Sequence, residues 1–324
     1  MRMHPKAAEA VEYADNEGDH AAELKFGISH ETLRRYRRAV KQSSDGADMG
    51  DTFDAGTDRL LQQIGQKLTR KELEAIAKSG SFDRTERTIS ADWFDGDSLK
   101  IGVVTDTHIG SKSFREDWFD GAVDRFLAAD VDVVLHVGDI SEGMSNRPGH
   151  IYELTHLGYS EQLDACIEQM SKLADFPVYA IDGNHDRWFV KSNGAKIVPA
   201  VCDALDNMTF LGHDTGVLDI GGIRVQLWHG EDGASYAHSY RLQKVIEALP
   251  GGKKPHVLVS GHVHKSGYFF ERNVHAFLSG CIQEQTPWMR SKRLPAHPGF
   301  WILDMDINAG SIVRMSPTFY PYYY

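Results

Sequence analysis

The sequence predicts an α/β protein, because short apolar segments alternate with amphipathic segments of helical spacing from about residue 98 to the end. Strands are expected at 100–104, 132–137, 177–181, 223–228 and 256–260. Several of these are continuous runs of Val, Ile and Leu, the pattern of strands that helices cover on both faces. Helices are expected at 114–130, 160–175 and 239–252, and a C-terminal β region at 267–271, 274–280, 300–307 and 311–316.

The first 42 residues predict a small helical head. Segment 20–42 contains a helix, a turn around Gly27 and a second helix capped by Ser29, which is the order of a helix-turn-helix motif. It resembles small DNA-binding modules of that class, although a basic helix face is also a common solvated surface. The DNA contacts that this resemblance implies are Arg34, Arg35, Arg37, Arg38 and Lys41.

Residues 43–97 are expected to form an acidic, Gly-rich linker followed by short helices, before a domain that spans 98–324. No apolar stretch is long enough for a membrane span, and the N-terminus is too polar for a signal peptide, so we expect a soluble intracellular protein. The formal net charge of −11 argues against binding a polyanion over the whole surface, but a local basic patch remains compatible with it.

Polar residues follow each of the first five expected strands, at the end where open α/β sheets bind ligands. The segments are TDTHIG (105–110), GDISEG (138–143), DGNHDR (182–187), HGEDG (229–233) and GHVHK (261–265). Most contain Asp or His beside a glycine that lets the backbone turn sharply. Five such segments in one chain predict a shared site, whereas a single one would more often be a hydrogen-bonded core histidine.

These segments resemble the signature blocks of the calcineurin-like metallophosphoesterases, D-x-H, G-D, G-N-H-D, H-G and G-H-x-H, over roughly residues 98–305. The resemblance implies a two-sheet α/β/β/α sandwich that binds two divalent transition-metal ions. Imidazole and carboxylate donors suit Mn²⁺, with Fe or Zn²⁺ as alternatives. By resemblance, Asp106, His108 and His264 hold the first metal, Asp139 bridges, and Asn184, His229 and His262 complete the second site.

The resemblance also implies the reaction, in which a hydroxide that bridges the metals attacks phosphorus in line. His185 is expected near the leaving group, and Glu142 is expected to orient His185. Gly143 stands where protein phosphatases of this superfamily carry an Arg that grips phosphate, which argues against a protein phosphatase. The DTHIG block instead looks like that of the DNA double-strand-break repair nucleases and their bacterial and viral relatives.

Two polar or basic insertions, near residues 145–158 and 289–299, contain candidate substrate contacts. With a nearby arginine of the third block they are Arg147, His150, Arg187, Arg290, Lys292 and Arg293, with solvated loop charge as the alternative. The favoured function is hydrolysis of phosphodiester bonds in DNA. The alternatives are a phosphatase or diesterase acting on nucleotides or other small phosphate esters, and a DNA-binding regulator with a decayed hydrolase domain. The sequence does not identify an oligomeric state or a partner ATPase.

Overall fold

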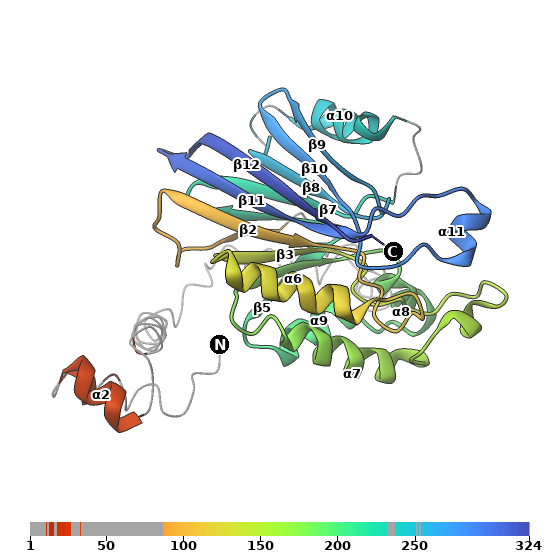
Figure 1. The fold of residues 1–324 in the computed structure, drawn as a ribbon, viewed down its shortest axis with the longest axis horizontal. Coiled ribbons are helices and arrows are strands. Elements are labelled where there is room, and N and C mark those ends of the chain that lie inside the picture. Colours follow the sequence, from red (N-terminus) through yellow and green to blue (C-terminus); the bar gives the residue numbers. More distant parts are fainter. Residues whose placement is uncertain are drawn as a thin grey trace, which may run out of the picture. The chain divides into compact units, whose positions relative to one another are not determined.

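The computed structural model describes residues 11, 13–15, 18–26, 33, 87–231, 237–250, 252 and 254–323 (Figure 1). The chain divides into two compact units, residues 1–79 and 80–324. In the first unit, helix α2 (Asp19–Phe26) buries Ala22 in a small apolar cluster that includes Leu33. The predicted short helices before residue 87 lie outside the described residues. So do the predicted DNA contacts Arg34, Arg35, Arg37, Arg38 and Lys41.

The second unit contains two mixed sheets of six strands each. One sheet has the spatial order β12 (Ser311–Pro321), β11 (Gly299–Asn308), β2 (Ser98–Val104), β3 (Val133–Val137), β4 (Val178–Asp182) and β5 (Met208–His213). The other has the order β1 (Thr88–Ser90), β6 (Thr215–Ile220), β7 (Ile223–Trp228), β8 (Val257–Ser260), β10 (Val274–Ser279) and β9 (Ser266–Glu271). The predicted two-sheet sandwich is confirmed.

Helices cover the outer face of each sheet (Figure 1). The first sheet is covered by α6 (Glu116–Ala128), α7 (Gly158–Ser171), α8 (Asp186–Asn193) and α9 (Ile197–Ala204), and the second by α10 (His238–Ala248). In α6, Phe119, Ala122 and Phe126 are buried because their spacing places them on one helix face. Two short elements lie at the predicted insertions: the 3₁₀ helix η2 (His150–Glu153) lies within the first, and α11 (Pro287–Ser291) overlaps the start of the second.

The continuous apolar runs in the strands have a different cause from the predicted one. Val104 and Val134 belong to the core beneath the helices, whereas Val103 and Leu135 belong to the core between the two sheets. Each central strand is therefore covered by helices on one face only, and by the other sheet on its second face. Both arrangements exclude water from both strand faces, so they produce the same sequence pattern.

Several elements were not expected from the sequence. Strand β1 pairs with β6 and so enters the sheet before residue 98, where the sequence places the start of the domain. Strand β5 lies at a sheet edge, where partly exposed positions weaken the apolar pattern. Within the described ranges, no helix combines the length and the apolar character that a membrane span needs.

Candidate metal centre and phosphoester site

The five polar segments converge at one end of the sandwich, and both sheets contribute to them. Strands β2, β3 and β4 are parallel neighbours in one sheet, and β7 and β8 are parallel neighbours in the other. The carboxyl ends of neighbouring parallel strands meet at the same edge, so the loops that follow them are brought together. Two sheets packed face to face place these two sets of loops against each other.

Three donors gather in a first group, Asp106, His108 and His264, whose ligand atoms all lie within 4.8 Å of one another. The Nε2 atoms of His108 and His264 are 3.1 Å apart, and His264 Nε2 is 3.2 Å from Asp106 Oδ1. All three side chains are buried. This group coincides with the set predicted for the first metal.

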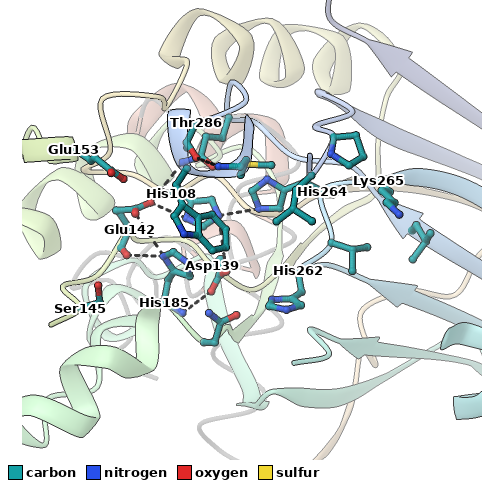
Figure 2. Close-up of a pocket in the computed structure, with 18 of the residues that line it drawn as sticks. His108, Asp139, Glu142, Ser145, Glu153, His185, His262, His264, Lys265 and Thr286 are labelled. Atoms are coloured by element: carbon teal, nitrogen blue, oxygen red, sulfur yellow. Dashed lines mark hydrogen bonds and ion pairs between the residues drawn. The ribbon is translucent and has the colours of Figure 1, made fainter. Parts of the chain in front are cut away.

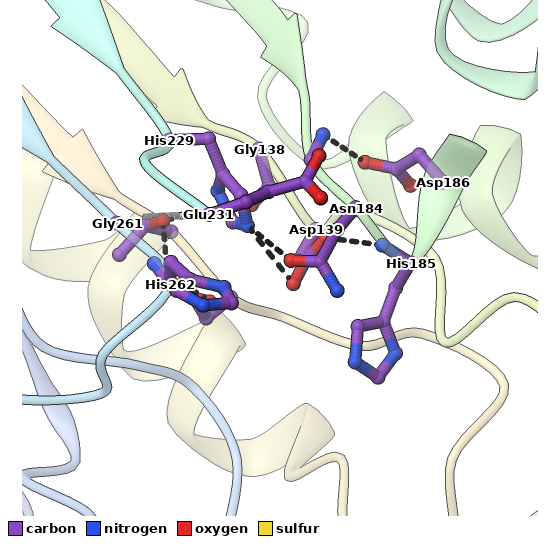
Figure 3. A network of polar contacts seen from close by, with 12 residues as sticks. Gly138, Asp139, Asn184, His185, Asp186, His229, Glu231, Gly261 and His262 are labelled. Carbon is purple, nitrogen blue, oxygen red and sulfur yellow. Dashed lines mark hydrogen bonds and ion pairs between the residues drawn. The ribbon is translucent and has the colours of Figure 1, made fainter. Parts of the chain in front are cut away.

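Asp139, His229 and His262 form a second group with the same spacing limit of 4.8 Å. His229 Nε2 lies 3.1 Å from Asp139 Oδ2 and 3.1 Å from Asn184 Oδ1 (Figure 3). Asp139 Oδ2 is also 3.8 Å from His108 Nε2 in the first group. Asp139 therefore lies between the two groups, which is the position predicted for a bridging ligand.

Five of these donor residues adopt the left-handed backbone conformation. The φ angles are 50° at Asp106, 51° at His108, 52° at Asp139, 71° at His262 and 52° at His264. This conformation costs a residue with a Cβ roughly 1–2 kcal/mol, and such strain concentrates at functional sites. The loops hold it in part through backbone hydrogen bonds, such as His108 N to Asp139 O at 3.1 Å.

The glycine of the third block has another role than the sharp turn expected from the sequence. Gly138 and Gly230 have positive φ angles and do turn the chain. Gly183 does not, but a Cβ added to it would lie only 2.1 Å from Asp139 Oδ1. Gly183 is therefore required because Asp139 packs directly against the backbone.

The electrostatics of the two groups fit divalent cations. Burial is the largest influence on the Asp106 carboxyl and would raise its pKa, but the charge and hydrogen bond of His264 and the charge of His229 together lower this pKa to about 2. Burial would likewise lower the pKa of His229, but Asp139 and Asp106 together raise it to about 9. The buried carboxylates are thus stabilised by nearby positive charge. In the protein without metal, protons on the imidazoles provide this charge. Oxygen and imidazole donors without thiolate suit Mn²⁺, Fe or Zn²⁺, so the residues present fit such ions.

Outer contacts aim the histidines into the site. His229 Nδ1 donates to the carbonyl of Val137 at 2.8 Å, and His108 Nδ1 lies 2.9 Å from the Glu142 carboxylate. Both contacts leave Nε2 as the nitrogen that faces the donor group, an arrangement typical of metal-binding histidines. Asp186, which the sequence analysis did not single out, accepts hydrogen bonds from the backbone nitrogens of Ser141 and Gly183 at 2.8 and 2.9 Å. It thereby ties the second block to the third.

His185 lies beside the donor groups with its ring fixed on several sides. The ring packs on Trp188, with centroids 3.8 Å apart, and contacts the edge of His108 at 4.5 Å. Its Nδ1 is 2.8 Å from the carbonyl oxygen of Glu142. Because a carbonyl only accepts hydrogen bonds, Nδ1 carries the proton and Nε2 remains for a substrate. Burial lowers the pKa of His185, although Asp139 and Glu142 act in the opposite direction.

Glu142 differs from its expected role. Its carboxylate contacts His108 and His150, the latter at 2.8 Å, and lies 3.7 Å from His185 Nδ1. Glu142 therefore holds His185 through its backbone carbonyl and orients His108 with its side chain. A Cβ added to Gly143 would lie 2.2 Å from the His185 carbonyl, so an Arg would not fit here without moving His185.

The structure separates the predicted substrate contacts from one another. His150 is buried, and its two ring nitrogens bond to Glu142 and to the Ser145 backbone, so it is not free to bind substrate. The guanidinium of Arg187 is committed to Asp182, Asp214 and Glu231. Arg147 faces the site but pairs with Glu153 at 2.6 Å. The exposed residues Arg290, Lys292 and Arg293 belong to the α11 segment without lining the pocket.

A pocket of about 460 Å³ opens beside the donor groups (Figure 2). Its lining includes His108, Asp139 and His185, together with three residues that the sequence analysis did not select, namely Trp188, Lys265 and Trp288. Two of these lie within or next to blocks already noted, since Trp188 is three residues after His185 and Lys265 directly follows His264. Their nearness to the blocks was the available signal, and the signal for Trp288 was that it directly precedes the predicted insertion at 289–299.

Comparison with known proteins agrees with this geometry. Residues 99–306 match a family model described as the calcineurin-like phosphoesterase superfamily domain. A DNA polymerase II small subunit of Methanothermobacter thermautotrophicus is 27% identical over 241 residues, which cover 59% of this chain and 49% of that protein. Its counterpart from Halobacterium salinarum is 28% identical over 268 residues, covering 69% and 52%. This chain thus spans about half the length of these relatives.

Solved structures also resemble the chain at low identity. A structure of a novel archaeal phosphodiesterase covers 68% of this chain and 100% of its own, with a TM-score of 0.42 and 18% identity. Wild-type Vps29 of Entamoeba histolytica complexed with zinc covers 68% and 99%, with a TM-score of 0.37 and 15% identity.

Proposed function

Because this chain belongs to the calcineurin-like phosphoesterase superfamily, we propose that it hydrolyses phosphodiester bonds in DNA with the help of two divalent metal ions. The observation that carries the proposal is the position of Asp139. Its carboxylate belongs to the second donor group and lies 3.8 Å from a histidine of the first. A shared carboxylate between two donor groups is what a two-metal phosphoesterase requires.

In this proposal Asp106, His108 and His264 would hold one ion, Asn184, His229 and His262 would hold the other, and Asp139 would be shared between them. When bound, two such cations neutralise charge on the phosphoryl oxygens and lower the pKa of water. We propose Mn²⁺, and Fe or Zn²⁺ would suit the same donors. The Glu142 carboxylate beside His108 Nδ1 and the Val137 carbonyl beside His229 Nδ1 keep the Nε2 atoms of these two histidines turned toward the donor groups.

We propose that His185 donates a proton to the leaving group. Its Nδ1–H is taken by the Glu142 carbonyl, which leaves Nε2 as the nitrogen available on the pocket side. In the neutral ring Nε2 has a lone pair, so His185 must first be protonated before it donates a proton to a departing oxygen. Burial lowers its pKa and so favours giving that proton up.

Two observations support DNA as the substrate. The relatives that match this chain are named DNA polymerase II small subunits, and the N-terminal segment has a basic helix-turn-helix pattern. We therefore propose that this chain acts on DNA inside the cell and has a polymerase subunit as its partner. The alternative substrate is a nucleotide or other small phosphate ester, because a pocket of about 460 Å³ lies in the range of small-ligand sites. A decayed hydrolase is disfavoured because all the predicted donor positions are filled.

The test compares single-stranded DNA, duplex DNA and bis-p-nitrophenyl phosphate as substrates of the purified protein reconstituted with Mn²⁺. We expect hydrolysis of DNA, and we expect Asp139→Asn to lose both metal ions and most activity. Hydrolysis of the small diester but of neither DNA would move the assignment to small phosphate esters. A folded wild-type protein that retains only trace metal after reconstitution would overturn the two-metal proposal.

The role of the N-terminal segment is tested separately by deleting residues 1–42. If its five basic side chains neutralise about four phosphates, a plot of the logarithm of the DNA-binding constant against the logarithm of salt concentration has a slope of about −3.6, since each contact contributes about −0.9. The deletion should flatten this slope and spare hydrolysis of bis-p-nitrophenyl phosphate, because the donors all lie beyond residue 105. Unchanged affinity and salt dependence would make this segment an assembly element.

A further inference from the structure

The pocket beside the donor groups has two chemically different sides. Figure 2 shows Glu153 and Lys265 at opposite ends, with His108, Asp139 and His185 between them. The Glu153 end contains Arg147, which pairs with Glu153 and lies 5.9 Å from the centre of the Trp288 ring. The reacting phosphate of the proposed function would thus sit between an aromatic end and a lysine end.

The aromatic end is built to receive a flat apolar group. The Trp288 side chain lines the pocket and is 42% exposed, so its ring is available to a ligand. Met289, Leu294 and Pro295 from the same segment also line the pocket and add apolar surface to it. Trp188 belongs to this side through its packing on His185, but that packing already uses one face of its ring. Arg147 likewise lies over the Trp288 ring, so the difference between the two rings is exposure, with Trp288 exposed and Trp188 partly buried. Trp288 is therefore the stacking surface, and Trp188 positions His185.

The lysine end is suited to a phosphate. Lys265 lines the pocket, and among the described residues it has no ion-pair partner. The charge of Arg147, in contrast, is balanced by Glu153. A ligand that spans the pocket therefore meets, at one end, a lysine charge that no carboxylate of the described ranges pairs with and, at the other end, an aromatic face.

We infer that this pocket binds one unstacked nucleotide of a single strand, with the base of the leaving nucleoside on Trp288 and the backbone phosphate on the other side of the cleaved bond near Lys265. The inference rests on the proposed function. The leaving side is assigned to Trp288 because Figure 2 shows His185 on the Glu153 side of the pocket, and Arg147, which pairs with Glu153, lies 5.9 Å from the Trp288 ring. A paired and stacked base cannot present its face to Trp288, so the strand must be single or locally opened.

Dinucleoside monophosphates test this inference because each contains one cleavable bond. The nucleoside released without phosphate identifies the leaving side. We expect removal of the base from that side to lower kcat/KM between about 5-fold and 150-fold, the range of one base–aromatic stack, and removal from the other side to have little effect. Trp288→Ala should abolish this difference. Phe270→Ala, which removes an exposed aromatic outside the pocket, should keep it.

Equilibrium binding provides a readout that does not depend on hydrolysis. A single-stranded trinucleotide with 2-aminopurine should lose fluorescence on binding to wild type and to Phe270→Ala, and Trp288→Ala should raise its Kd between about 5-fold and 150-fold. Lys265→Gln should weaken the trinucleotide more than 2-aminopurine mononucleotide. Equal Kd for wild type and Trp288→Ala would overturn the proposed stacking site. Equal affinity for mononucleotide and trinucleotide would overturn the proposal that the pocket binds part of a strand.

These outcomes separate the inference from the proposed function. Hydrolysis of dinucleotides with equal rates for base-containing and abasic leaving groups would sink the base site and leave the phosphodiesterase intact. Base-dependent binding without hydrolysis of any diester by the Mn²⁺-loaded protein would support the base site and overturn the proposed phosphodiesterase function.

Discussion

The backbone nitrogen of His185 donates a hydrogen bond of 2.8 Å to Asp139 Oδ1. The acid that both donor groups share therefore also fixes the loop that carries the histidine we assign to the leaving group. Asp139 packs against Gly183 in the same loop, where a side chain has no space. The geometry of the donors and the position of His185 are consequently linked through one carboxylate.

Gly183→Ala tests this link. The added methyl would collide with Asp139 Oδ1, so Asp139 must shift. We expect metal affinity to fall about 10- to 100-fold, the usual effect of disturbing a contact behind a metal ligand. Titration with Mn²⁺ measures it. Gly252→Ala is the matched control, because a Cβ there meets no atom within 4 Å. Equal affinity in the two variants would show that Asp139 does not depend on Gly183.

His185→Ala should leave metal occupancy near wild type and lower kcat about 10²- to 10⁴-fold on substrates with poor leaving groups. The loss should be smaller for p-nitrophenyl esters, because p-nitrophenolate departs with little protonation. Kinetics on paired substrates, with metal analysis of the same samples, measure both effects. Equal losses on good and poor leaving groups would rule out the role that we assign to His185.

Metal binding should release protons at neutral pH. Asp139 and Asp106 together raise the pKa of His229 to about 9 against the effect of burial, so this ring is protonated in the metal-free protein at pH 7. Only the neutral ring binds a metal, so at least this proton must leave and affinity must fall as pH decreases. Calorimetry in buffers of different ionisation enthalpy measures the proton release. Metal binding without proton release would mean that His229 is neutral before the metal arrives.

His136 should destabilise the fold in acid. It is buried in β3, and burial lowers its pKa from 6.5 to about 3. Above pH 6.5 the ring is neutral in both the folded and the unfolded states, so it does not affect the pH dependence there. Below pH 6.5 the His136 ring binds a proton in the unfolded chain but not in the folded protein. The free energy of unfolding therefore falls by up to about 1.4 kcal/mol for each pH unit.

Urea unfolding of the metal-free protein at pH 7, 6 and 5 measures this effect. His136→Gln should lose less stability than wild type between pH 6 and pH 5, whatever its stability at pH 7. Parallel curves for the two proteins would contradict the low pKa of His136.

The donor groups were predictable because each residue follows directly after a strand. The order of the strands in the sheets determines where a residue such as Asp106 or His262 lies. The apolar runs locate the strands along the chain, and the resemblance of the five polar segments to the superfamily blocks implies the order. The assignment of each strand to one of two sheets was not readable from the runs themselves, because a layer of helices buries Val104 as fully as the facing sheet buries Val103.

Contacts within loops were less predictable. Glu142 was expected to orient His185 with its carboxylate, but backbone geometry turns that carboxylate toward His108 and presents the carbonyl instead. Trp288 reaches the pocket from a position just before the predicted insertion at 289–299, more than 100 residues after His185, and the sequence analysis selected the basic residues of that insertion instead. Such contacts depend on side-chain packing between distant segments.

The left-handed backbone at the donors has a consequence for how this chemistry is lost in evolution. Asp, Asn, His and Gly tolerate such φ angles, whereas β-branched residues do not. A descendant that no longer needs metals is therefore free to replace Asp106 or His264, but only within this short set of residues if the loops are to keep their shape. We expect inactive descendants to have Asn or Gly at these positions and an intact sandwich. Their fold would resemble that of an active hydrolase, and only the donor residues would distinguish the two.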